Sequence, residues 1–291
     1  VSGTTYITNS IISNYPIGIE RTGGAVIENY NLFDGNTVNL SGTVTSGGNS
    51  ITGTAAFFDT TSYTLTASSA AIDRGTNLGV TSDFFGDPRP QQFAPDIGYD
   101  ESPFANYGLA CYATADGATV FGSDNAQAVR NALAAASAGG VVKIAGYCAG
   151  AVLDSGDTQV ALITKTLTVA GGYTVTNWTT SYPITQPTTL DAAQGGRVIF
   201  ITGTVSVAIE GLQIAGGLIG DDGGGVYAES ASVTISNSQV YSNTADGGDG
   251  GGIFSGGILT VTNSSFFDNA AFVDGGGISN NGSNALLFVT D

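Results

Sequence analysis

The hydrophobic and polar positions of this chain repeat with a period near 26 residues. The pattern Val-Thr-Ile-Ser-Asn-Ser-Gln-Val-Tyr-Ser-Asn at residues 233–243 returns as Leu-Thr-Val-Thr-Asn-Ser-Ser-Phe-Phe-Asp-Asn at residues 259–269. Three Gly-Gly-Gly runs, which begin at Gly223, Gly250 and Gly275, recur at nearly the same interval. Self-similarity at such a period is typical of solenoids, in which each repeat forms one coil.

Within each repeat, hydrophobic residues alternate with polar ones, as in strands that turn one face inward. Val233 and Ile235 in one copy correspond to Leu259 and Val261 in the next. Coils of equal length stack in register, so these strands pair in parallel. We therefore predict an all-β fold, a right-handed parallel β-helix (β-solenoid). Its interior is expected to contain Ile7, Val26, Val207, Val233, Ile235, Leu259, Val261 and Val289.

One segment has the pattern of a helix rather than of a strand. Residues 126–138 are rich in alanine, and Ala126, Val129 and Leu133 lie near one face at helical spacing. Asp124 precedes the segment as a candidate N-cap, and two glycines follow it. We predict one short helix near residues 124–138. It would cover the otherwise exposed end of a coil stack.

The order of the pieces along the chain is unusual. Residues 104–291 have the pattern of the capped beginning of a β-helix, with the helix first and regular coils after it. Residues 1–103 have the pattern of the end of one, because coils near Tyr6 and Val26 give way to a segment rich in turn formers. The sequence thus predicts two domains, 1–103 and 104–291.

The turn-rich segment resembles a known family. It contains Ser-Ala-Ala-Ile-Asp-Arg-Gly at 69–75, Asp-Phe-Phe-Gly-Asp-Pro-Arg-Pro at 83–90 and Pro-Asp-Ile-Gly-Tyr-Asp-Glu at 95–101. These runs resemble the C-terminal signature of bacterial right-handed parallel β-helix surface proteins of the choice-of-anchor Q type. The coils are similar to repeats of that family and of polymorphic outer-membrane proteins. The resemblance implies a β-helix fold and a place at the cell surface, although the order of the two parts departs from the family.

Charge and composition exclude several functions. The 291 residues carry a formal net charge of −17, which repels nucleic acid and favours cations as ionic partners. The chain has no histidine, so a Ser-His-Asp triad or a zinc site built on imidazole is excluded. No apolar run approaches the length that a membrane-spanning helix needs.

Catalysis by carboxylates alone remains the rival interpretation, because parallel β-helices include polysaccharide lyases and hydrolases. Asp221, Asp222, Asp246 and Asp249 could supply acids. The basic residues all lie before the regular coils that follow Val205, so a lyase base beside them is not expected. We expect no enzyme. A polysaccharide-active enzyme and a carbohydrate-binding module are the alternatives.

Three aspartates stand at equivalent points of successive coils. Asp222, Asp249 and Asp274 each precede a glycine run, and stacking in register would place them about 5 Å apart, the spacing of neighbouring strands. Like charges that close must cap backbone N–H groups, extend into water or share a cation such as calcium. Capping and a calcium site are both open at this point, and no other cofactor is expected.

Two pairs of asparagines also recur at the coil period. Asn237 and Asn263 are equivalent, as are Asn243 and Asn269. Stacked asparagines can form a ladder of side-chain hydrogen bonds from coil to coil. We assign this ladder to Asn237 and Asn263, with left-handed turn geometry as the alternative role.

The two cysteines, Cys111 and Cys148, fit no zinc or redox spacing. A single disulfide is the preferred interpretation, and two free buried thiols are the alternative. A disulfide implies an oxidising environment. This agrees with an extracellular or cell-surface location.

These observations predict a non-catalytic structural or adhesive surface protein. The chain begins without methionine, and we interpret it as an excerpt, a processed product or one period of an array. Its coils are expected to associate head to tail into a filament, with Leu287 and Val289 of one copy beside Tyr6 and Ile7 of the next. The expected partners are other copies of the chain and a surface polysaccharide.

Overall fold

The computed structural model describes residues 3–58, 61–106, 108–154, 156–283 and 285–290. The chain divides into two compact units, Val1–Gly108 (unit 1) and Leu109–Asp291 (unit 2). This boundary falls a few residues after the one expected from the sequence.

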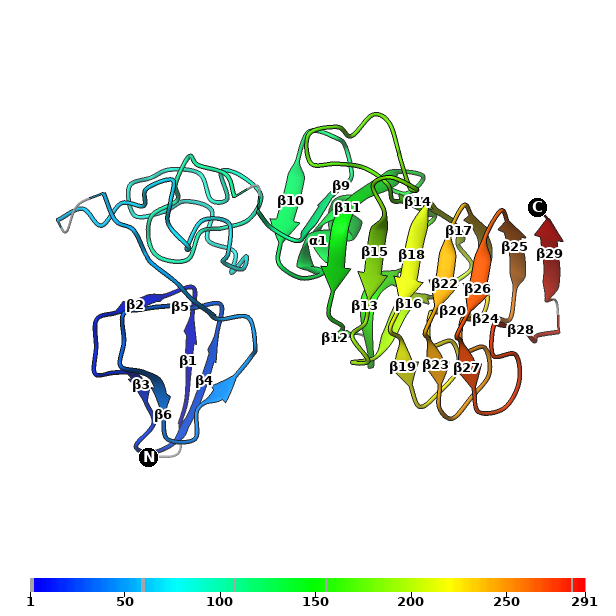
Figure 1. The fold of residues 1–291 in the computed structure, drawn as a ribbon, viewed down its shortest axis with the longest axis horizontal. Helices are drawn as coiled ribbons and strands as arrows, with labels where there is room; N and C mark the ends of the chain where they lie inside the picture. The colour runs from blue at the N-terminus through cyan, green and yellow to red at the C-terminus, as the bar shows by residue number, and fades with distance from the viewer. Residues whose placement is uncertain (1–2, 59–60, 107, 155, 284, 291) are drawn as a thin grey trace. The chain divides into compact units, whose positions relative to one another are not determined.

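Unit 2 is a parallel β-helix whose strands stack coil upon coil (Figure 1). Strand β11 (Val141–Ala149) pairs with both β14 and β15 and so joins two rows of parallel strands. The first row contains β14 (Leu167–Ala170), β17 (Ser206–Glu210), β21 (Ser232–Ser236), β25 (Ile258–Thr262) and β29 (Leu286–Thr290). The second row contains β15 (Thr188–Asp191), β18 (Leu212–Ala215), β22 (Gln239–Tyr241) and β26 (Ser265–Phe267).

Two further parallel sheets complete the coils. The third row contains β13 (Asp157–Ile163), β16 (Arg197–Ile201), β20 (Val226–Ala228), β24 (Ile253–Ser255) and β28 (Ile278–Asn280), with β12 (Val152–Asp154) antiparallel to β13. Short strands β19 (Leu218–Ile219), β23 (Thr244–Ala245) and β27 (Ala270–Ala271) form the last row. The predicted all-β parallel β-helix is confirmed.

The repeat in the sequence becomes the register of the strands. Val207, Val233 and Leu259 are aligned across β17, β21 and β25, and all three are buried. Ile209, Ile235 and Val261 form a second buried column in the same strands. Alternation of inward and outward side chains therefore fills one continuous core.

Three residues predicted for the interior are not buried. Ile7 and Val26 are half-buried, and Val289 is 63% exposed. Val289 lies in β29, which pairs with β25 on one side and forms the edge of its sheet. Val289 is aligned with the buried Val261 and so lies on the inward face of the strand. It remains exposed because no further coil packs on β29 among the described residues.

The glycine runs allow neighbouring coils to approach closely. The first glycine of each run, Gly223, Gly250 and Gly275, has a φ between 65° and 69°, a conformation that L side chains rarely adopt. A Cβ atom on Gly251 would lie only 2.0 Å from the carbonyl oxygen of Ala270 in the next coil. Backbone contact between coils thus explains why the runs recur.

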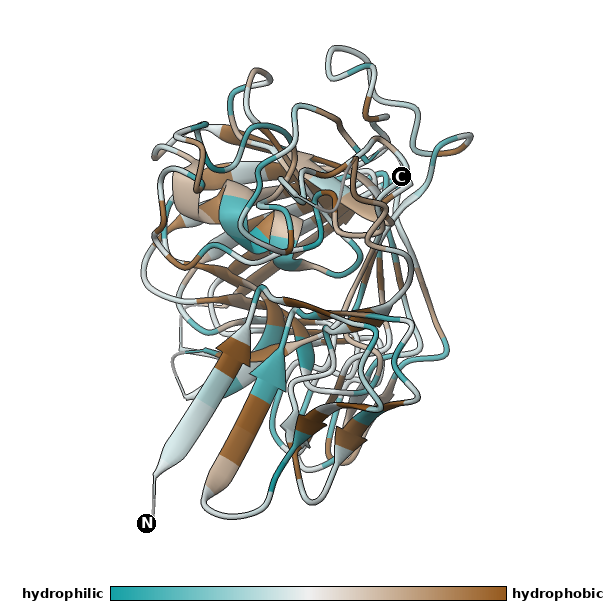
Figure 2. Ribbon diagram, turned by 90° about the vertical axis from the view of Figure 1, so that its left-hand side faces the viewer, coloured by the Kyte–Doolittle hydropathy of each residue, from teal (hydrophilic) through white to brown (hydrophobic). Residues whose placement is uncertain are grey.

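Helix α1 (Gln127–Ala135) covers the first coils, as predicted, but it is shorter than the expected segment. It carries both hydrophilic and hydrophobic residues (Figure 2), and Val129 and Leu133 lie in the core. Its first turn is capped by Asn125, which accepts a hydrogen bond from the Gln127 N–H, and by Ser123, which accepts one from the Ala128 N–H. The expected cap was Asp124.

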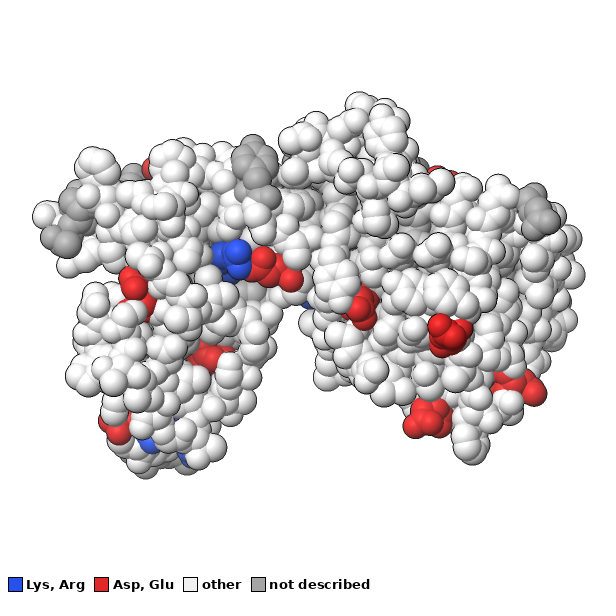
Figure 3. All heavy atoms as spheres, viewed as in Figure 1, with Lys and Arg blue, Asp and Glu red and all other residues white. Residues whose placement is uncertain are grey.

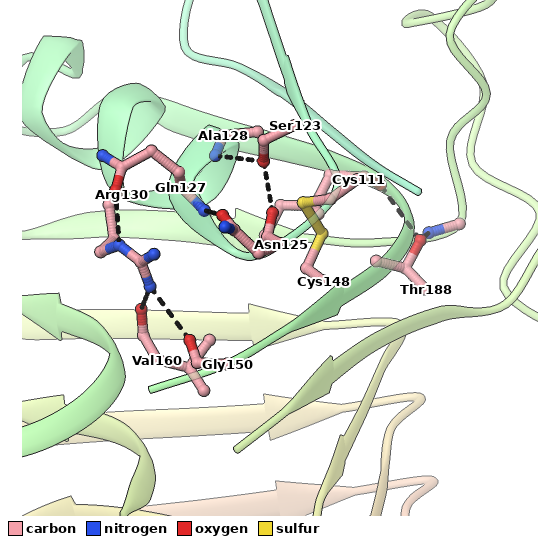
Figure 4. Close-up of a disulfide and its surroundings, with 12 residues drawn as sticks. Cys111, Ser123, Asn125, Gln127, Ala128, Arg130, Cys148, Gly150, Val160 and Thr188 are labelled. Carbon is pink, nitrogen blue, oxygen red and sulfur yellow. Dashed lines mark hydrogen bonds between the residues drawn. A yellow bond between two sulfur atoms is a disulfide. The ribbon is translucent and has the colours of Figure 1, made fainter. Parts of the chain in front are cut away.

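Antiparallel strands also frame this end of unit 2. β9 (Cys111–Thr114) pairs with β10 (Val120–Ser123) on one side and with β11 on the other. The side chain of Arg130 in α1 donates hydrogen bonds to the carbonyl oxygens of Gly150 and Val160 (Figure 4). These bonds tie the helix to the strands below it.

Unit 1 begins with a smaller set of parallel strands. Its three sheets are formed by β1 (Thr4–Thr8), β4 (Ala25–Asn29) and β7 (Thr45–Ser46), by β2 (Ile11–Ser13), β5 (Leu32–Asp34) and β8 (Ile51–Thr52), and by β3 (Ile17–Glu20) and β6 (Val38–Ser41). Thr4 pairs with Ala25, so the coil here is shorter than in unit 2. This difference explains why the repeat near the start of the sequence is weak.

Buried carboxylates organise the turn-rich remainder of unit 1. Asp73 accepts hydrogen bonds from the backbone N–H groups of Phe93, Ala94 and Asn106. Asp96 and Glu101, both 1% exposed, accept further backbone N–H groups, and Glu101 also lies 3.3 Å from the Arg89 guanidinium. Burial raises the pKa of Asp96 to about 8 and that of Glu101 to about 7. The residues that resemble the anchor signature therefore hold this segment together.

Candidate functional site

The outward face of β15, β18, β22 and β26 carries a row of hydrogen-bonding side chains. Thr189 Oγ1 donates to Gln213 Oε1 at 2.9 Å, and Gln213 Nε2 donates to Gln239 Oε1 at 3.4 Å. The strand register places these residues, with Ser265 after them, at one position of successive coils. Each side chain is thus positioned by the coil before it.

A groove of about 580 Å³ runs beside this row. One wall is the segment with Pro183, Ile184 and Pro187, of which Ile184 is 93% exposed. The opposite side contains the turns of two coils, including the exposed Asn237 and Asn263. The described residues that line the groove are all uncharged: Pro183, Ile184, Pro187, Gly211, Leu212, Gln213, Asn237, Ser238, Gln239, Asn263, Ser264 and Ser265.

Aromatic rings lie on the same sheet face. Tyr241 follows Gln239 by two residues, so both side chains leave the strand on the same side. The Tyr241 ring is stacked on Phe267 of the next coil, with centroids 4.9 Å apart and an interplanar angle of 2°. Figure 3 shows that uncharged residues cover most of the surface over these strands, with acidic residues as separate spots.

An ionisable pair stands at the start of this face. The Tyr147 hydroxyl donates a hydrogen bond of 2.5 Å to a carboxylate oxygen of Asp191. This bond, together with partial burial and the Asp191 charge, raises the pKa of Tyr147 to about 12. Tyr147 is therefore a neutral hydrogen-bonded ring at physiological pH and not a general base.

The asparagine ladder forms between Asn243 and Asn269 and not, as predicted from the sequence, between Asn237 and Asn263. Asn243 Nδ2 donates to Asn269 Oδ1 at 3.0 Å, and the Asn243 side chain also bonds the backbone of Gly217 and Ile214. Asn237 and Asn263 instead adopt left-handed backbone conformations, with φ of 51° and 46°. They take the turn role because their side chains point outward at the groove, where they are exposed.

The stacked aspartates cap backbone groups of the next coil. Asp222 Oδ1 accepts the N–H of Asp249 at 2.7 Å, and Asp249 Oδ1 accepts the N–H of Asp274 at 2.9 Å. Among the described residues, no group of three acidic or cysteine side chains is placed to hold a metal ion. These bonds support the capping role of Asp222 and Asp249, whereas a calcium site at Asp222, Asp249 and Asp274 stays a prediction.

The disulfide between Cys111 and Cys148 is confirmed (Figure 4). Both cysteines are fully buried, and the bond links β9 to β11 near the first turn of α1. The alternative of two free buried thiols is therefore wrong. The disulfide fixes the covered end of unit 2 across a separation of 37 residues.

Arg197 is a buried cation that the sequence did not single out. Only 1% of it is exposed, and its guanidinium donates to the carbonyl oxygens of Asp222 and Gly223 and lies 3.6 Å from Asp157. The rings of Phe200 and Tyr227 lie about 5 Å from the guanidinium carbon. The strand register aligns three aromatic residues of successive coils, Phe200, Tyr227 and Phe254. Their recurrence in the sequence is the signal that could have identified the aromatic column on which Arg197 packs.

The residues expected to mediate assembly lie in edge strands. Tyr6 and Ile7 belong to β1, which pairs with β4, and Tyr6 is 71% exposed. Leu287 and Val289 belong to β29, which pairs with β25. The two strands lie in different units, and their contact between copies stays a prediction.

Comparison of the chain with protein-family models, with curated proteins and with solved structures finds no match. Within the described part of the chain, no helix has the length and apolar character needed to cross a bilayer.

Proposed function

We propose that this chain is a non-catalytic structural and adhesive protein that acts outside the cytoplasm and holds a neutral glycan in the groove of unit 2. The observation that carries the proposal is an uncharged groove, lined by amide and hydroxyl groups, in a chain with a net charge of −17. The disulfide supports an extracytoplasmic location. The resemblance to bacterial surface β-helix proteins supports the same place of action.

The groove has the chemistry that an uncharged sugar chain requires. Gln239, Asn237 and Asn263 offer donors and acceptors that can replace the water around sugar hydroxyls. The stacked rings of Tyr241 and Phe267 offer an apolar platform beside them. An acidic polysaccharide would meet the negative field of the whole chain, so a neutral one is favoured.

The structural part of the proposal is supported by polar side chains that form hydrogen bonds within the turns and between coils. The carboxylates of Asp222 and Asp249, which could have served as catalytic acids, accept backbone hydrogen bonds in a turn. The ladders of asparagine, glutamine and aromatic residues connect one coil to the next. Such repeated contacts suit a rigid rod that presents a binding face.

Affinity electrophoresis in native gels that contain a neutral or an acidic polysaccharide tests the proposal. We expect a neutral polysaccharide to retard the chain and the double variant Gln239→Ala, Tyr241→Ala to lose the retardation. The matched control is Thr234→Ala, an exposed change on β21 in another sheet row. Retardation by acidic polysaccharide alone would contradict the neutral-glycan part.

The same samples test the absence of catalysis. Polysaccharide recovered after incubation is assayed for new reducing ends and for unsaturated products. Release of either by the unchanged chain, with loss in the Asp222→Asn variant, would make the chain a polysaccharide-active enzyme. Self-association is tested separately by electron microscopy, where head-to-tail filaments are the expected result and isolated particles contradict it.

A further inference from the structure

Unit 1 contains a second cavity, with a volume of about 740 Å³. Pockets that hold small molecules have volumes of about 300 to 1,000 Å³. Four aromatic residues, Tyr15, Phe57, Tyr63 and Tyr99, line this cavity together with Asp100. It lies wholly within unit 1, and none of the function proposed above uses it.

Hydrogen bonds hold the walls of the cavity in place. The Gly98 N–H donates to the carbonyl oxygen of Asn9 at 2.9 Å, which joins the segment before β2 to the segment that carries Tyr99 and Asp100. The Leu65 N–H donates to Asp100 Oδ2 at 2.7 Å. This bond joins the segment that carries Tyr99 and Asp100 to the segment that carries Phe57, Tyr63 and Leu65. The cavity is therefore formed before any ligand arrives, which lowers the cost of binding.

The aromatic side chains are arranged with their rings accessible. Phe57 and Tyr63 meet edge to face, with centroids 5.2 Å apart, and the backbone bridge between Phe57 and Leu65 fixes this pair. Tyr63 has a φ of 52°, which is uncommon for a bulky residue, yet 45% of it remains exposed. A turn that needed only the left-handed conformation would be more stable with glycine. The ring itself is thus what this position provides.

Asp100 supplies the one charge among the described residues that line the cavity. It is 7% exposed, and one of its oxygens, Oδ2, accepts the Leu65 N–H. The other oxygen, Oδ1, has no hydrogen-bond partner within the described part of unit 1. Burial raises the pKa of Asp100, and the charges of Asp83 and Asp87 add to this effect.

The cation nearest in sequence does not neutralise this carboxylate directly. Arg89 lowers the pKa of Asp100, but its guanidinium lies 3.3 Å from Glu101 and donates to the backbone carbonyls of Gly98 and Asp96. Asp100 therefore combines a buried anion, an open acceptor and neighbouring aromatic rings. Aromatic faces and a carboxylate both attract the same kind of ligand, an organic cation.

We propose that this cavity, the Tyr63–Asp100 pocket, binds the ammonium group of a small organic cation. Asp100 Oδ1 forms the ion pair, while Tyr63, Phe57, Tyr15 and Tyr99 contact the methyl or methylene groups around the nitrogen. The net charge of −17 draws cations toward the chain, and none of the described residues that line the pocket is basic. A neutral molecule of the same shape gains only the apolar part of these contacts.

Isothermal titration calorimetry of the full chain tests the proposal with two probes of equal shape. One is choline, and the other is its neutral carbon isostere, in which a tert-butyl group replaces the trimethylammonium group. We expect choline to bind at least about tenfold more tightly, since a cation over aromatic rings near a carboxylate gains on the order of one factor of ten or more. Equal affinity of the two probes, or no binding of choline at millimolar concentration, overturns the proposal.

Two variants assign the binding to this pocket. Asp100→Asn keeps an oxygen for the Leu65 N–H but removes the charge, so choline binding should fall about tenfold. Tyr63→Gly relieves the left-handed backbone and removes the ring, and it should weaken choline binding while the chain stays folded. The control Asp191→Asn, in unit 2, should leave choline affinity unchanged. Unchanged affinity in both pocket variants would place the binding elsewhere and contradict the proposal.

Discussion

Residues of one type take different roles at the same spacing in the chain. Asn237 and Asn263 stand in left-handed turns at the surface, whereas Asn243 and Asn269 join their side chains inside the coil stack. Both pairs recur at the same interval, so the sequence predicted a ladder but assigned it to Asn237 and Asn263, which is the wrong pair. The deciding factor is the direction of each side chain, which depends on the turn before it.

The fully buried Asn243 should be a major contributor to the stability of unit 2. Replacing it with alanine leaves the Gly217 N–H without its acceptor and removes the side-chain hydrogen bond to the Ile214 carbonyl, and we expect the free energy of unfolding to fall by about 2 to 4 kcal/mol. Urea denaturation followed by circular dichroism measures the change. Asn237→Gly is the control, because glycine suits the left-handed turn, and it should change stability by less than about 0.5 kcal/mol.

The disulfide offers a second test at the scale of single residues. In the chain-entropy model, a loop of this length stabilises the folded state by roughly 3 to 4 kcal/mol. The double variant Cys111→Ala, Cys148→Ala should lose about that amount without burying new polar groups. Reductant added to the unchanged chain should lower its unfolding midpoint toward that of the variant. A variant as stable as the oxidised chain would show that the packing around α1 suffices.

At the scale of elements, the sequence predicted the strands and the helix whose positions follow from a local pattern of hydrophobic residues. Strands β17, β21 and β25 and their register follow from the 26-residue repeat, and α1 follows from the alanine-rich segment between two turn signals. The turn-rich part of unit 1 was not predictable in this way. Asp73 bonds backbone groups 20 to 33 residues away, and no pattern of hydrophobic positions encodes such contacts. The groove escaped prediction for the same reason, since residues 183–187 reach it from outside the regular coils.

The turns that carry the stacked aspartates provide a test of metal binding. Because Asp222 and Asp249 cap backbone N–H groups, we expect that a chelator of divalent cations leaves the unfolding midpoint unchanged. Asp249→Ala should cost about 1 kcal/mol, and Asp249→Asn should cost less because its amide oxygen still accepts the Asp274 N–H. A clear stabilisation by added calcium that Asp249→Asn removes would favour the calcium site over capping alone.

At the scale of the whole molecule, the two units use different polar groups in their interiors. Unit 2 connects its coils largely through neutral amide, hydroxyl and aromatic side chains, together with the capped aspartates and the buried Arg197. Unit 1 buries carboxylates, among them Asp96 and Glu101, whose pKa values are raised to about 8 and about 7. The stability of unit 1 should therefore depend on pH in a way that differs from that of unit 2.

The sign of this dependence follows from proton binding. In the unfolded chain the two carboxyl groups ionise near their ordinary pKa values of 3.8 and 4.5, whereas in folded unit 1 they keep their protons to about 8 and about 7. The folded state thus binds more protons between about pH 4 and pH 8, so its stability must fall as the pH rises through that range. Their contribution is fully present below about pH 4 and is lost above the folded pKa values.

We therefore expect the unfolding temperature of unit 1 to be lower at pH 8.5 than at pH 5.5, two values that lie on opposite sides of the folded pKa values, about 8 and about 7. Scanning calorimetry of the full chain follows both units, while fluorescence of Trp178, the single tryptophan, follows unit 2 alone. The chain has no histidine and both cysteines form the disulfide, so unit 2 should change little over this range, whereas unit 1 loses its buried protons. The calorimetric transition that Trp178 does not report should move further than the one it reports. Equal shifts of the two transitions would mean that Asp96 and Glu101 ionise inside the folded unit without cost, contrary to the effect of their burial.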